Sequence, residues 1–341
     1  MTRENLQVLL RRRPRGAPTP DDFELRRAPV PEPGEGEVLI RHQFLSLDPY
    51  MRGRMSDAKS YAKPVEVGEV MESRACGVVE TSRHPRFRPG DVVLGGYGWQ
   101  TYSAVDGRAL MRLDPAEAPI STSLGVLGMP GLTAYVGMQI IGRPKPGETV
   151  VVSAASGAVG SVVGQIAKQA GARAVGIAGG PEKCAFVVDE LGFDACLDHR
   201  APGDGGSGNG LEAALDRACP DGVDVYFENV GGDVQRAVFP RLRDFARVVM
   251  CGMVAEYNDT ERRPGPNLMD AVRKRLHIQG FIVSDHFDRM KEWRAMAAPW
   301  LRDGKLRYRE SVVDGLEQAP EAFIGLLQGR NFGKLVVRVG E

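Results

Sequence analysis

Thr149-Val-Val-Val-Ser-Ala-Ala-Ser-Gly-Ala-Val-Gly160, followed by a run of small and apolar residues to Ala170, decides the fold of this chain. Up to Ser153 the residues are mostly β-branched and apolar, which is typical of a strand buried on both faces of a parallel sheet. Small residues follow, and from Ala158 to Ala170 apolar residues recur at helical spacing. A strand, a small-residue turn and a helix N-terminus together form an anion site, because backbone N–H groups and the helix dipole favour negative charge there.

The glycine spacing in this turn points to a pyrophosphate but does not establish one. Gly157 and Gly160 have the spacing G-x-x-G, whereas Ala155 replaces the first glycine of the dinucleotide fingerprint G-x-G-x-x-G. Turns of this kind also occur in strand–helix units that bind no nucleotide. The rest of the chain therefore decides between the two interpretations.

Composition limits the possible classes of protein. A chain of 341 residues is long enough for two domains with separate cores. Its 44 Lys and Arg balance 44 Asp and Glu, which argues against nucleic acid or an anionic membrane as the main partner. No apolar run approaches the roughly 18 residues of a membrane span, and the N-terminus lacks a signal-peptide pattern, so we expect a cytoplasmic protein.

The cysteines and histidines predict neither disulfides nor a metal site. The five cysteines are odd in number and form no C-x-x-C pair, so we expect reduced thiols. The five histidines show no metal-ligand spacing. These residues are Cys76, Cys184, Cys196, Cys219 and Cys251, and His42, His84, His199, His277 and His286.

The first part of the chain has a strand pattern. Residues 1–30 are interpreted as a lead-in strand with a basic turn at 11–15, the alternative being a functional basic patch. Short strands separated by Pro-Gly and Gly-Gly turns then predict a small antiparallel barrel or sandwich. The expected strands are 38–47, 78–80, 91–94 and 100–105, and helices are expected from Pro119 and from Gly128.

From Thr149 strands alternate with helices, which predicts a doubly wound parallel sheet of the Rossmann type. The expected strands are 149–153, 173–178, 195–197, 223–228, 247–253 and 278–283; the expected helices include 182–191, 211–218 and 234–242. The glycine-rich run 203–210 is predicted to be a surface loop, because no strand precedes it directly and it lacks Gly-Lys-Ser/Thr.

The last segment has a different pattern and is expected to return to the first domain. It consists of a helix at 287–302, a strand at 308–313, a helix at 317–327 and a strand at 334–339. We therefore predict one β-rich substrate domain from residues 1–128 and 306–341. A dinucleotide-binding domain, residues 129–305, is inserted between its two pieces.

The end of the second predicted parallel strand favours NADP(H) over NAD(H). Domains that bind NAD usually place Asp or Glu there to accept the ribose 2′-OH. This chain has Gly179 and Gly180, followed by Lys183, so a 2′-phosphate meets a cation and no acid. The alternative for Lys183 is an exposed lysine in the first turn of a helix.

Other strand ends place polar groups on the same rim, since ligands bind outside the carboxyl ends of parallel strands. Asn229 follows the fourth strand, where it either faces a ligand or forms a local Asx-turn. Gly252 follows the fifth strand and permits close backbone approach, and Tyr257 adds a phenol. The sixth strand ends at 280–285.

Together these segments resemble the zinc-independent medium-chain dehydrogenases/reductases, in the group of prostaglandin reductases, leukotriene B4 12-hydroxydehydrogenase, alkenal double-bond reductases and curcumin reductase. That group has a phosphate motif A-x-x-G-x-x-G, which Ala154, Gly157 and Gly160 match. The segments that carry the resemblance are 47–52, 128–135, 154–161, 176–183, 227–232, 251–252, 257–258, 280–283 and 331–334.

The resemblance implies a Rossmann domain, a GroES-like β-rich domain and NADPH as the cofactor. It implies that the cofactor-binding residues are Met129, Thr133, Ala155, Gly157, Ala158, Val159, Gly179, Lys183, His199, Asn229, Cys251, Gly252, Tyr257, Phe281, Ile282, Val283, Asn331 and Gly333. Similar sequences often have Asn-Tyr-Lys where this chain has Asp198-His199-Arg200, so the degree of NADPH preference is open. A homodimer is implied by resemblance only.

The chain also differs from zinc-dependent relatives at the places where they carry metal ligands. It reads Ser46-Leu-Asp48 and Val67-Gly-Glu69 there, without a cysteine cluster. Without a Lewis acid, hydride addition to the double bond of a small hydrophobic enone or enal is the expected reaction, and a phenol such as Tyr257 can stabilise the developing oxyanion. The alternative for Tyr257 is packing over the nicotinamide, and Tyr50 is either a substrate contact or a wall. The competing functions are quinone reduction and non-catalytic NADPH binding.

Overall fold

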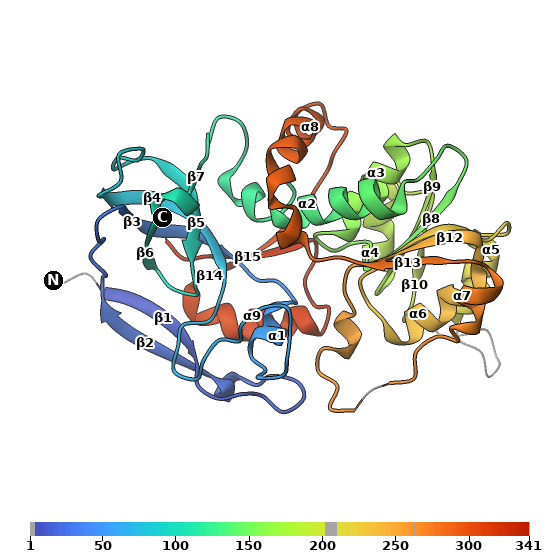
Figure 1. Cartoon of the computed structure of the whole chain (residues 1–341), viewed down its shortest axis with the longest axis horizontal. Helices are drawn as coiled ribbons and strands as arrows, with labels where there is room; N and C mark the ends of the chain where they lie inside the picture. The colour runs from blue at the N-terminus through green and yellow to red at the C-terminus, as the bar shows by residue number, and fades with distance from the viewer. Residues whose placement is uncertain (1–3, 202–209, 262, 341) are drawn as a thin grey trace.

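The computed structural model describes residues 4–201, 210–261 and 263–340. The predicted loop 203–210 lies outside these residues, except for Gly210. Figure 1 shows the molecule as two lobes, a β-rich lobe formed by both ends of the chain and a lobe built on a second sheet from the middle of the chain.

The middle of the chain forms a parallel sheet of six strands with the order β10-β9-β8-β11-β12-β13. Numbered along the chain this order is 3-2-1-4-5-6, which is the doubly wound topology predicted from the sequence. The strands are β8 (Thr149–Ser153), β9 (Arg173–Ala178), β10 (Ala195–Asp198), β11 (Val223–Glu228), β12 (Leu242–Met250) and β13 (His277–Gly280). All five pairs are parallel.

Helices cover both faces of this sheet (Figure 1). Those of the sheet's own repeats are α3 (Gly160–Gln169), α4 (Pro181–Ala185), the π-helix η5 (Phe186–Glu190), α5 (Gly210–Ala218), α6 (Gly232–Val238), η6 (Phe239–Arg241), η7 (Val254–Glu256) and α7 (Met269–Arg273). The expected helix 182–191 is thus divided between α4 and η5. The expected helix 234–242 is too long, because strand β12 already begins at Leu242 and pairs there with Val223.

Two predicted strands extend too far at their carboxyl ends. Strand β12 ends at Met250, and its last pair with β13 is Met250–Gly280. Beyond that pair neither strand has a partner in the other, so 251–253 and 281–282 form loops instead of sheet, and Val283 begins the 3-10 helix η8 (Val283–Arg289). This difference matters for function, because both loops are free to face a ligand.

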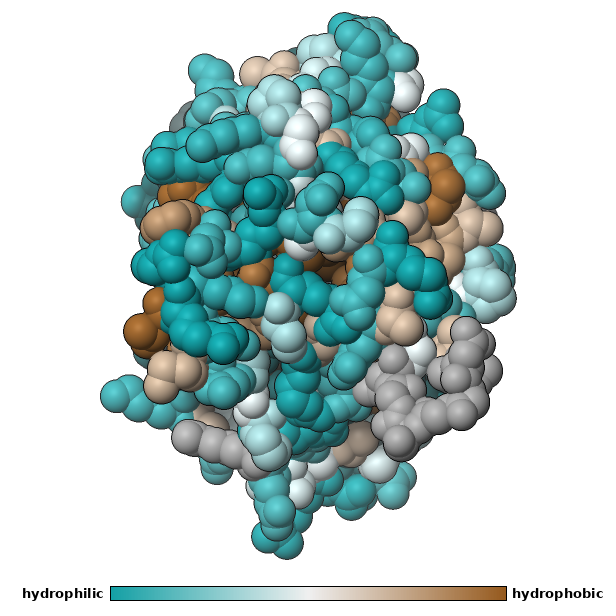
Figure 2. All heavy atoms as spheres, turned by 90° about the vertical axis from the view of Figure 1, so that its right-hand side faces the viewer, coloured by the Kyte–Doolittle hydropathy of each residue, from teal (hydrophilic) through white to brown (hydrophobic). Residues whose placement is uncertain are grey.

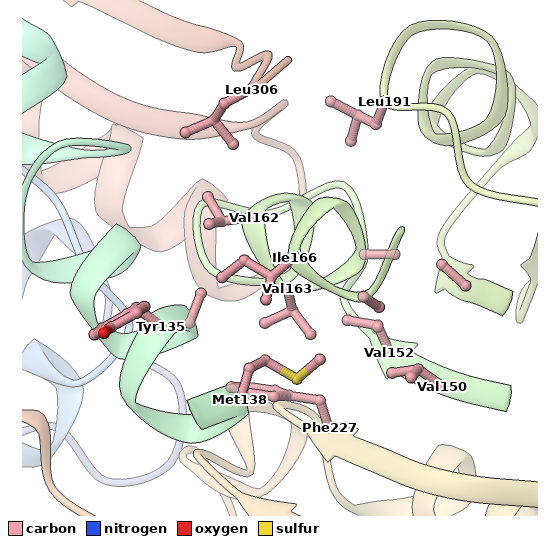
Figure 3. Packing of buried hydrophobic residues seen from close by; sticks show 14 of the residues in the cluster. Tyr135, Met138, Val150, Val152, Val162, Val163, Ile166, Leu191, Phe227 and Leu306 are labelled. Carbon is pink, nitrogen blue, oxygen red and sulfur yellow. The ribbon is translucent and has the colours of Figure 1, made fainter. Parts of the chain in front are cut away.

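The core of this lobe is packed between α3 and the sheet (Figure 3). Val162, Val163 and Ile166 of α3 belong to one buried cluster with Val152 of β8 and Phe227 of β11. Burial of each such side chain stabilises the fold by about 1.5–3 kcal/mol. The helical spacing of these apolar residues therefore reflects the packing of α3 against the sheet that contains the preceding strand, β8.

The two ends of the chain share a seven-stranded sheet. The order is β14-β15-β3-β4-β5-β7, and β6 also pairs with β3. Its strands are β3 (Glu37–Ser46), β4 (Arg74–Ser82), β5 (Val92–Tyr97), β6 (Tyr102–Asp106), β7 (Met111–Arg112), β14 (Glu310–Asp314) and β15 (Lys334–Arg338). Only β14 and β15 are parallel to each other. A separate hairpin, β1 (Glu4–Leu10) and β2 (Phe23–Pro29), forms the lead-in.

Short helices complete this lobe and bind the C-terminal segment to it. They are η1 (Pro20–Asp22), α1 (Met51–Arg54), η2 (Gly107–Ala109), η3 (Ile120–Leu124), η9 (Leu316–Gln318) and α9 (Ala319–Leu327). Phe323 of α9 packs edge-on against Trp99, which stacks on Phe23 at 5.6 Å between ring centroids. Strand β15 pairs with β3. The domain boundaries at 128/129 and 305/306 stay a prediction.

Four helical segments join the lobes: α2 (Met129–Val136), the π-helix η4 (Gly137–Gly142), η8 (Val283–Arg289) and α8 (Met290–Arg302). The buried Trp293 of α8 donates to the Val126 carbonyl and lies 5.5 Å from the ring of Tyr135 in α2. The helices predicted from Pro119 and over 287–302 begin as the 3-10 helices η3 and η8. No helix in the described ranges is long and apolar enough to cross a membrane.

Candidate dinucleotide and substrate cleft

A cavity of about 550 Å³ lies between the two lobes. That volume falls within the range of small-molecule sites. Its walls contain nearly all the residues predicted to bind a cofactor or substrate, namely Tyr50, Met129, Thr133, Gly157, Ala158, Val159, Gly179, Lys183, His199, Asn229, Cys251, Gly252, Tyr257, Phe281, Ile282, Val283, Asn331 and Gly333.

Ala155 is the exception among these predicted residues, and its contact with a cofactor stays a prediction. It does not line the cavity, and its side chain is fully buried. Its N–H donates to the Ile177 carbonyl, and its methyl group packs so closely against Gly176 that a Cβ there would lie 2.7 Å away. A small residue is needed at 155 to fit the turn onto β9, so its role is to pack beneath the site.

The turn between β8 and α3 has the geometry of an anion site. Ala154 adopts φ +50°, and Gly157 N–H donates back to the Ala154 carbonyl. A Cβ on Gly160 would lie 2.3 Å from that carbonyl oxygen, so only glycine fits there. No side chain caps the first turn of α3. Ser161 N–H donates to the Gly157 carbonyl and Val162 N–H to the Val159 carbonyl, so what this end of α3 offers a pyrophosphate is the helix dipole and the small-residue turn before it.

The end of β11 is held by a buried carboxylate that the sequence analysis did not single out. Glu228 accepts hydrogen bonds from Ser153 Oγ, the Tyr226 hydroxyl and the N–H groups of Val230 and Gly231. Burial raises the pKa of Glu228. Its backbone carbonyl accepts from the N–H groups of residues 251 and 252. One residue thus fixes the two strand ends that flank the reversal in strand order.

Asn229 lies beside this network at the point where β8 and β11 meet. Its Nδ2 donates to the Ser153 carbonyl at 2.8 Å, and its N–H donates to Ser153 Oγ. The amide thus ties two strand ends together and does not close a local Asx-turn; Asn229 also lines the cavity, and its contact with a ligand stays a prediction. Thr133 of α2 lines the cavity too, while its hydroxyl donates to the Met129 carbonyl.

Positive groups gather at the end of β9. A Cβ on Gly179 would lie 2.8 Å from Arg200 Nε and 3.0 Å from His199 Nε2, so glycine leaves room for both side chains. Lys183 Nζ donates to the Gly329 carbonyl at 2.7 Å. Burial and the charge of Arg200 lower the pKa of Lys183, and the same two causes act on the pKa of His199. A bound anion would relieve this mutual repulsion.

The nearest acid of this pocket is turned away from it. Asp198 accepts from the N–H groups of Gly180 and Arg200 at 2.8 and 2.9 Å. Arg200 itself lines the cavity but was not among the predicted contacts. Its signal in the sequence was its place directly after His199 at a strand end.

Aromatic and charged side chains form the other end of the cavity. Tyr50 is hydrogen bonded to Glu72, and burial, with the carboxylates of Asp48 and Glu72, raises the pKa of Tyr50 above its ordinary range. Arg54 Nε donates to Glu72, while its guanidinium lies 5.3 Å from the ring centre of Tyr50 and 4.7 Å from that of Tyr61. The hydroxyl proton of Tyr50 is thus already engaged, which favours a wall over a proton donor.

Tyr257 lines the cleft beside Gly252. Its hydroxyl lies 3.0 Å from where a Cβ on Gly252 would stand, so the glycine permits this approach. Burial raises the pKa of Tyr257, with smaller contributions from Cys251 and Tyr61. The phenol therefore keeps its proton near neutral pH. Burial also raises the pKa of the neighbouring Cys251 thiol to about 12, so that group is uncharged.

The segment before β15 closes the cleft over the phosphate turn. Gly333 donates to the Ser156 carbonyl at 3.1 Å and forms a parallel bridge with Gly157. Asn331 Nδ2 donates to the Gly333 carbonyl and holds this segment in shape. A segment of the β-rich lobe is thereby brought to the phosphate turn of the parallel-sheet lobe.

Comparisons with known proteins agree with this geometry. A family model described as the N-terminal domain of oxidoreductase matches residues 6–113, and one described as zinc-binding dehydrogenase matches residues 158–302. The NADPH-dependent curcumin reductase of Escherichia coli (strain K12) is 49% identical, over 98% of this chain and 97% of its own length. The 2-alkenal reductase (NADP(+)-dependent) of Nicotiana tabacum is 40% identical over 98% of this chain and 97% of its own.

A solved structure extends the similarity to three dimensions. The crystal structure of CurA in complex with NADPH from Vibrio vulnificus superimposes with a TM-score of 0.92 and 49% identity, covering 98% of this chain and 99% of that one. This chain belongs to the medium-chain dehydrogenase/reductase family. Within that family it falls in the group of curcumin, 2-alkenal and prostaglandin reductases.

The second family model is described as zinc-binding dehydrogenase, and the metal site is the feature in which this chain differs from that description. Among the described residues no three His, Cys, Asp or Glu side chains come together as a possible metal site. In the segment Ser46-Leu-Asp48, which matches a place where zinc-dependent relatives carry a cysteine, the Asp48 carboxylate is paired with a buried ammonium. Lys334 Nζ donates to Asp48 Oδ1 and to the carbonyls of Leu47 and Leu335.

Proposed function

We propose that this protein is an NADPH-dependent reductase of the carbon–carbon double bond of α,β-unsaturated ketones and aldehydes. The observation that carries the proposal is one cavity that is lined both by a cationic pocket and by the protonated phenol of Tyr257. The names of two relatives, an NADPH-dependent curcumin reductase and a 2-alkenal reductase, support the same class of substrate.

The residues of the cleft fit both phosphate-bearing parts of NADPH, the pyrophosphate and the 2′-phosphate. The N-terminal end of α3 and the small-residue turn before it, which line the cavity from Ser156 to Gly160, suit the pyrophosphate. Lys183, His199 and Arg200 suit the 2′-phosphate, because their mutual repulsion falls when an anion joins them. When bound, NADPH supplies the hydride that reaches the β-carbon of the substrate.

Tyr257 is proposed to stabilise the negative charge that develops on the substrate carbonyl oxygen. Burial raises the pKa of the phenol further above neutral, so it is protonated and can donate to an oxyanion. Tyr50 and Tyr61, with Arg54 and Glu72 between them, are proposed as the wall that receives the hydrophobic part of the substrate.

The test of this function is the loss of absorbance at 340 nm when NADPH is mixed with enals, enones and quinones. We expect turnover with enals and enones, and mass spectrometry should show a saturated product that keeps its carbonyl group. Turnover restricted to quinones would favour a quinone reductase. Tight NADPH binding with no turnover of any compound would favour a non-catalytic NADPH-binding protein.

The cofactor preference has its own test in Lys183→Glu. Loss of a charged hydrogen-bond donor should raise KM for NADPH by at least about tenfold and KM for NADH far less. Lys291→Glu is the matched control, because that lysine is exposed on α8 and does not line the cavity. Equal effects of Lys183→Glu on the two cofactors would refute the assignment of the 2′-phosphate pocket.

A further inference from the structure

Two thiols lie next to the cationic pocket, on the two elements that build it. Cys184 is in α4, directly after Lys183, and Cys196 is in β10, three residues before His199. Their Sγ atoms are 3.1 Å apart, and the thiol of Cys196 donates to Cys184. Both residues are partly exposed, whereas Cys76 and Cys219 are buried.

The contact gives the two sulfurs different chemistry. The hydrogen bond from Cys196 lowers the pKa of Cys184, and the same bond raises the pKa of Cys196. Burial raises the pKa of Cys76, Cys219 and Cys251. Since the thiolate is the reactive form, Cys184 is the nucleophile of the pair and Cys196 is placed to act second.

We propose that Cys184 and Cys196 form a redox-active dithiol, that hydroperoxides convert it to a disulfide, and that this bond lowers the affinity of the adjacent pocket for NADPH. The effect on NADPH rests on the proposed function. The formation of the disulfide does not.

The oxidation proceeds in two steps. The Cys184 thiolate attacks the terminal oxygen of the hydroperoxide, the O–O bond breaks, and a sulfenic acid forms while the alcohol, or water from hydrogen peroxide, departs with a proton. Cys196 sulfur then attacks Cys184 sulfur, the S–O bond breaks, and water departs with the Cys196 proton. Two thiols lose two electrons and the hydroperoxide gains them. A small dithiol reverses the reaction by exchange.

Disulfide formation moves the element that carries Lys183. An S–S bond is about 2.05 Å long, so the two sulfurs must approach each other by roughly 1 Å. Helix α4 has only five residues and follows Gly180, which has φ +98°. Because α4 continues directly into η5, whose Phe186 and Val187 are buried in the core, the part drawn toward β10 is the N-terminal end of α4, which carries Lys183. The contact of Lys183 with Gly329 and its position beside Arg200 change with it.

The experiment treats the full chain with hydrogen peroxide, blocks the remaining thiols and maps the peptides by mass spectrometry. We expect a linked 184–196 peptide and the loss of two of the five thiols, both restored by dithiothreitol. Titration calorimetry should show the Kd for NADPH rising by at least about fivefold in the oxidised protein. The Kd for NADH should change less, because it lacks the 2′-phosphate.

Cys184→Ser and Cys196→Ser should each abolish the linked peptide and the peroxide-dependent change in Kd. Cys219→Ser, a buried thiol elsewhere in the same lobe, should behave as the parent protein. A folded protein that yields no 184–196 link overturns the dithiol, and a link with unchanged Kd overturns its coupling to the pocket. If the reduced protein fails to bind NADPH, the proposed function is refuted, while the peptide map still decides the dithiol.

Discussion

A single hydroxyl separates the proposed catalytic role of Tyr257 from a packing role. Its ring and its hydroxyl both lie in the cleft, the latter against Gly252. If the hydroxyl donates to the developing oxyanion, Tyr257→Phe should lower kcat for an enone by about 10- to 100-fold, as expected for the loss of one oxyanion donor in a site with other polar groups. Steady-state kinetics with NADPH absorbance measures this change.

The control for Tyr257→Phe is the binding of NADPH to the same variant. The phenylalanine ring keeps the packing, so the Kd for NADPH should change by less than about threefold, roughly 0.6 kcal/mol. A variant with unchanged kcat would show that the phenol only packs. Tyr50→Phe is the matched variant, and we expect a smaller effect on kcat because Glu72 already engages the Tyr50 hydroxyl.

The buried His42 makes stability depend on pH. Its Nδ1–H donates to the Gln100 carbonyl, and its Nε2 accepts from the Ser103 hydroxyl. Burial lowers the pKa of His42 from 6.5 to about 4. Between these values the unfolded chain binds a proton that the folded chain does not. Stability from this group is therefore complete above pH 6.5 and falls as pH drops toward 4, by about 3 kcal/mol in total.

Urea unfolding between pH 7.5 and pH 4 measures that loss. His42→Gln keeps an amide donor and acceptor at the site but cannot titrate in this window. The parent protein should therefore lose about 3 kcal/mol more than the variant over the same range. Parallel pH profiles for the two proteins would mean that His42 is accessible to protons in the folded state.

At the residue scale, the sequence predicted the residues that line the cleft better than the residues that hold the lining in place. Gly179, Lys183 and Asn229 were identified because they follow strand ends, and the topology brings strand ends together. Glu228 and Glu72 escaped notice because their roles come from distant partners. Glu228 binds Ser153 across the sheet, and Glu72 meets Arg54 from another element. Such contacts carry no local signal in the sequence.

At the scale of elements, the sequence predicted the parallel strands and missed how their ends behave. Residues 149–153, 173–178 and 223–228 are strands with the predicted bounds. Periodicity extended β12 to Met253 and β13 to Val283, because apolar residues continue past the last pair at Met250 and Gly280. Those residues are apolar because they line the cleft. A sheet pattern and a pocket pattern are alike in sequence.

The segment that docks on the phosphate turn is the element with the strictest steric demand. Gly333 has φ +66°, and a Cβ there would lie 2.0 Å from the Arg309 carbonyl oxygen. Gly333→Ala should therefore displace the segment from Gly157. We expect the free energy of unfolding to fall by more than the about 1 kcal/mol that backbone strain alone would cost. We also expect the KM for NADPH to rise at least about fivefold. Urea unfolding and steady-state kinetics measure the two effects.

Gly304→Ala is the control that separates the cost of backbone strain from the cost of steric overlap. Gly304 has φ +71°, and no atom lies within 4 Å of a Cβ placed there. Its substitution should cost only the backbone strain, with an unchanged KM for NADPH. If Gly333→Ala and Gly304→Ala behaved alike in both measurements, the segment before β15 would have no part in shaping the cleft.

At the scale of the whole molecule, one edge of the parallel sheet, at β13, has no neighbouring strand among the described residues. Strand β13 is the last strand of the six and pairs only with β12. Apolar residues beside it are exposed, with Ile278 at 38%, Val272 at 71% and Leu268 at 64%. By contrast, the end of this lobe seen in Figure 2 is largely hydrophilic, with hydrophobic residues in small separate groups.

A bare strand edge flanked by apolar side chains favours pairing with a second chain. Because a symmetric pairing uses the same edge twice, we expect a homodimer in which two β13 strands meet.

Light scattering coupled to size exclusion should give the mass of two chains for the parent protein. The double variant Val272→Asp with Ile278→Lys should give the mass of one, since it places charges on the joined edges. Leu25→Asp, 53% exposed on β2 of the other lobe, should remain a dimer. A parent protein with the mass of a single chain would refute this assembly, and a double variant that stays dimeric would move the interface to another face.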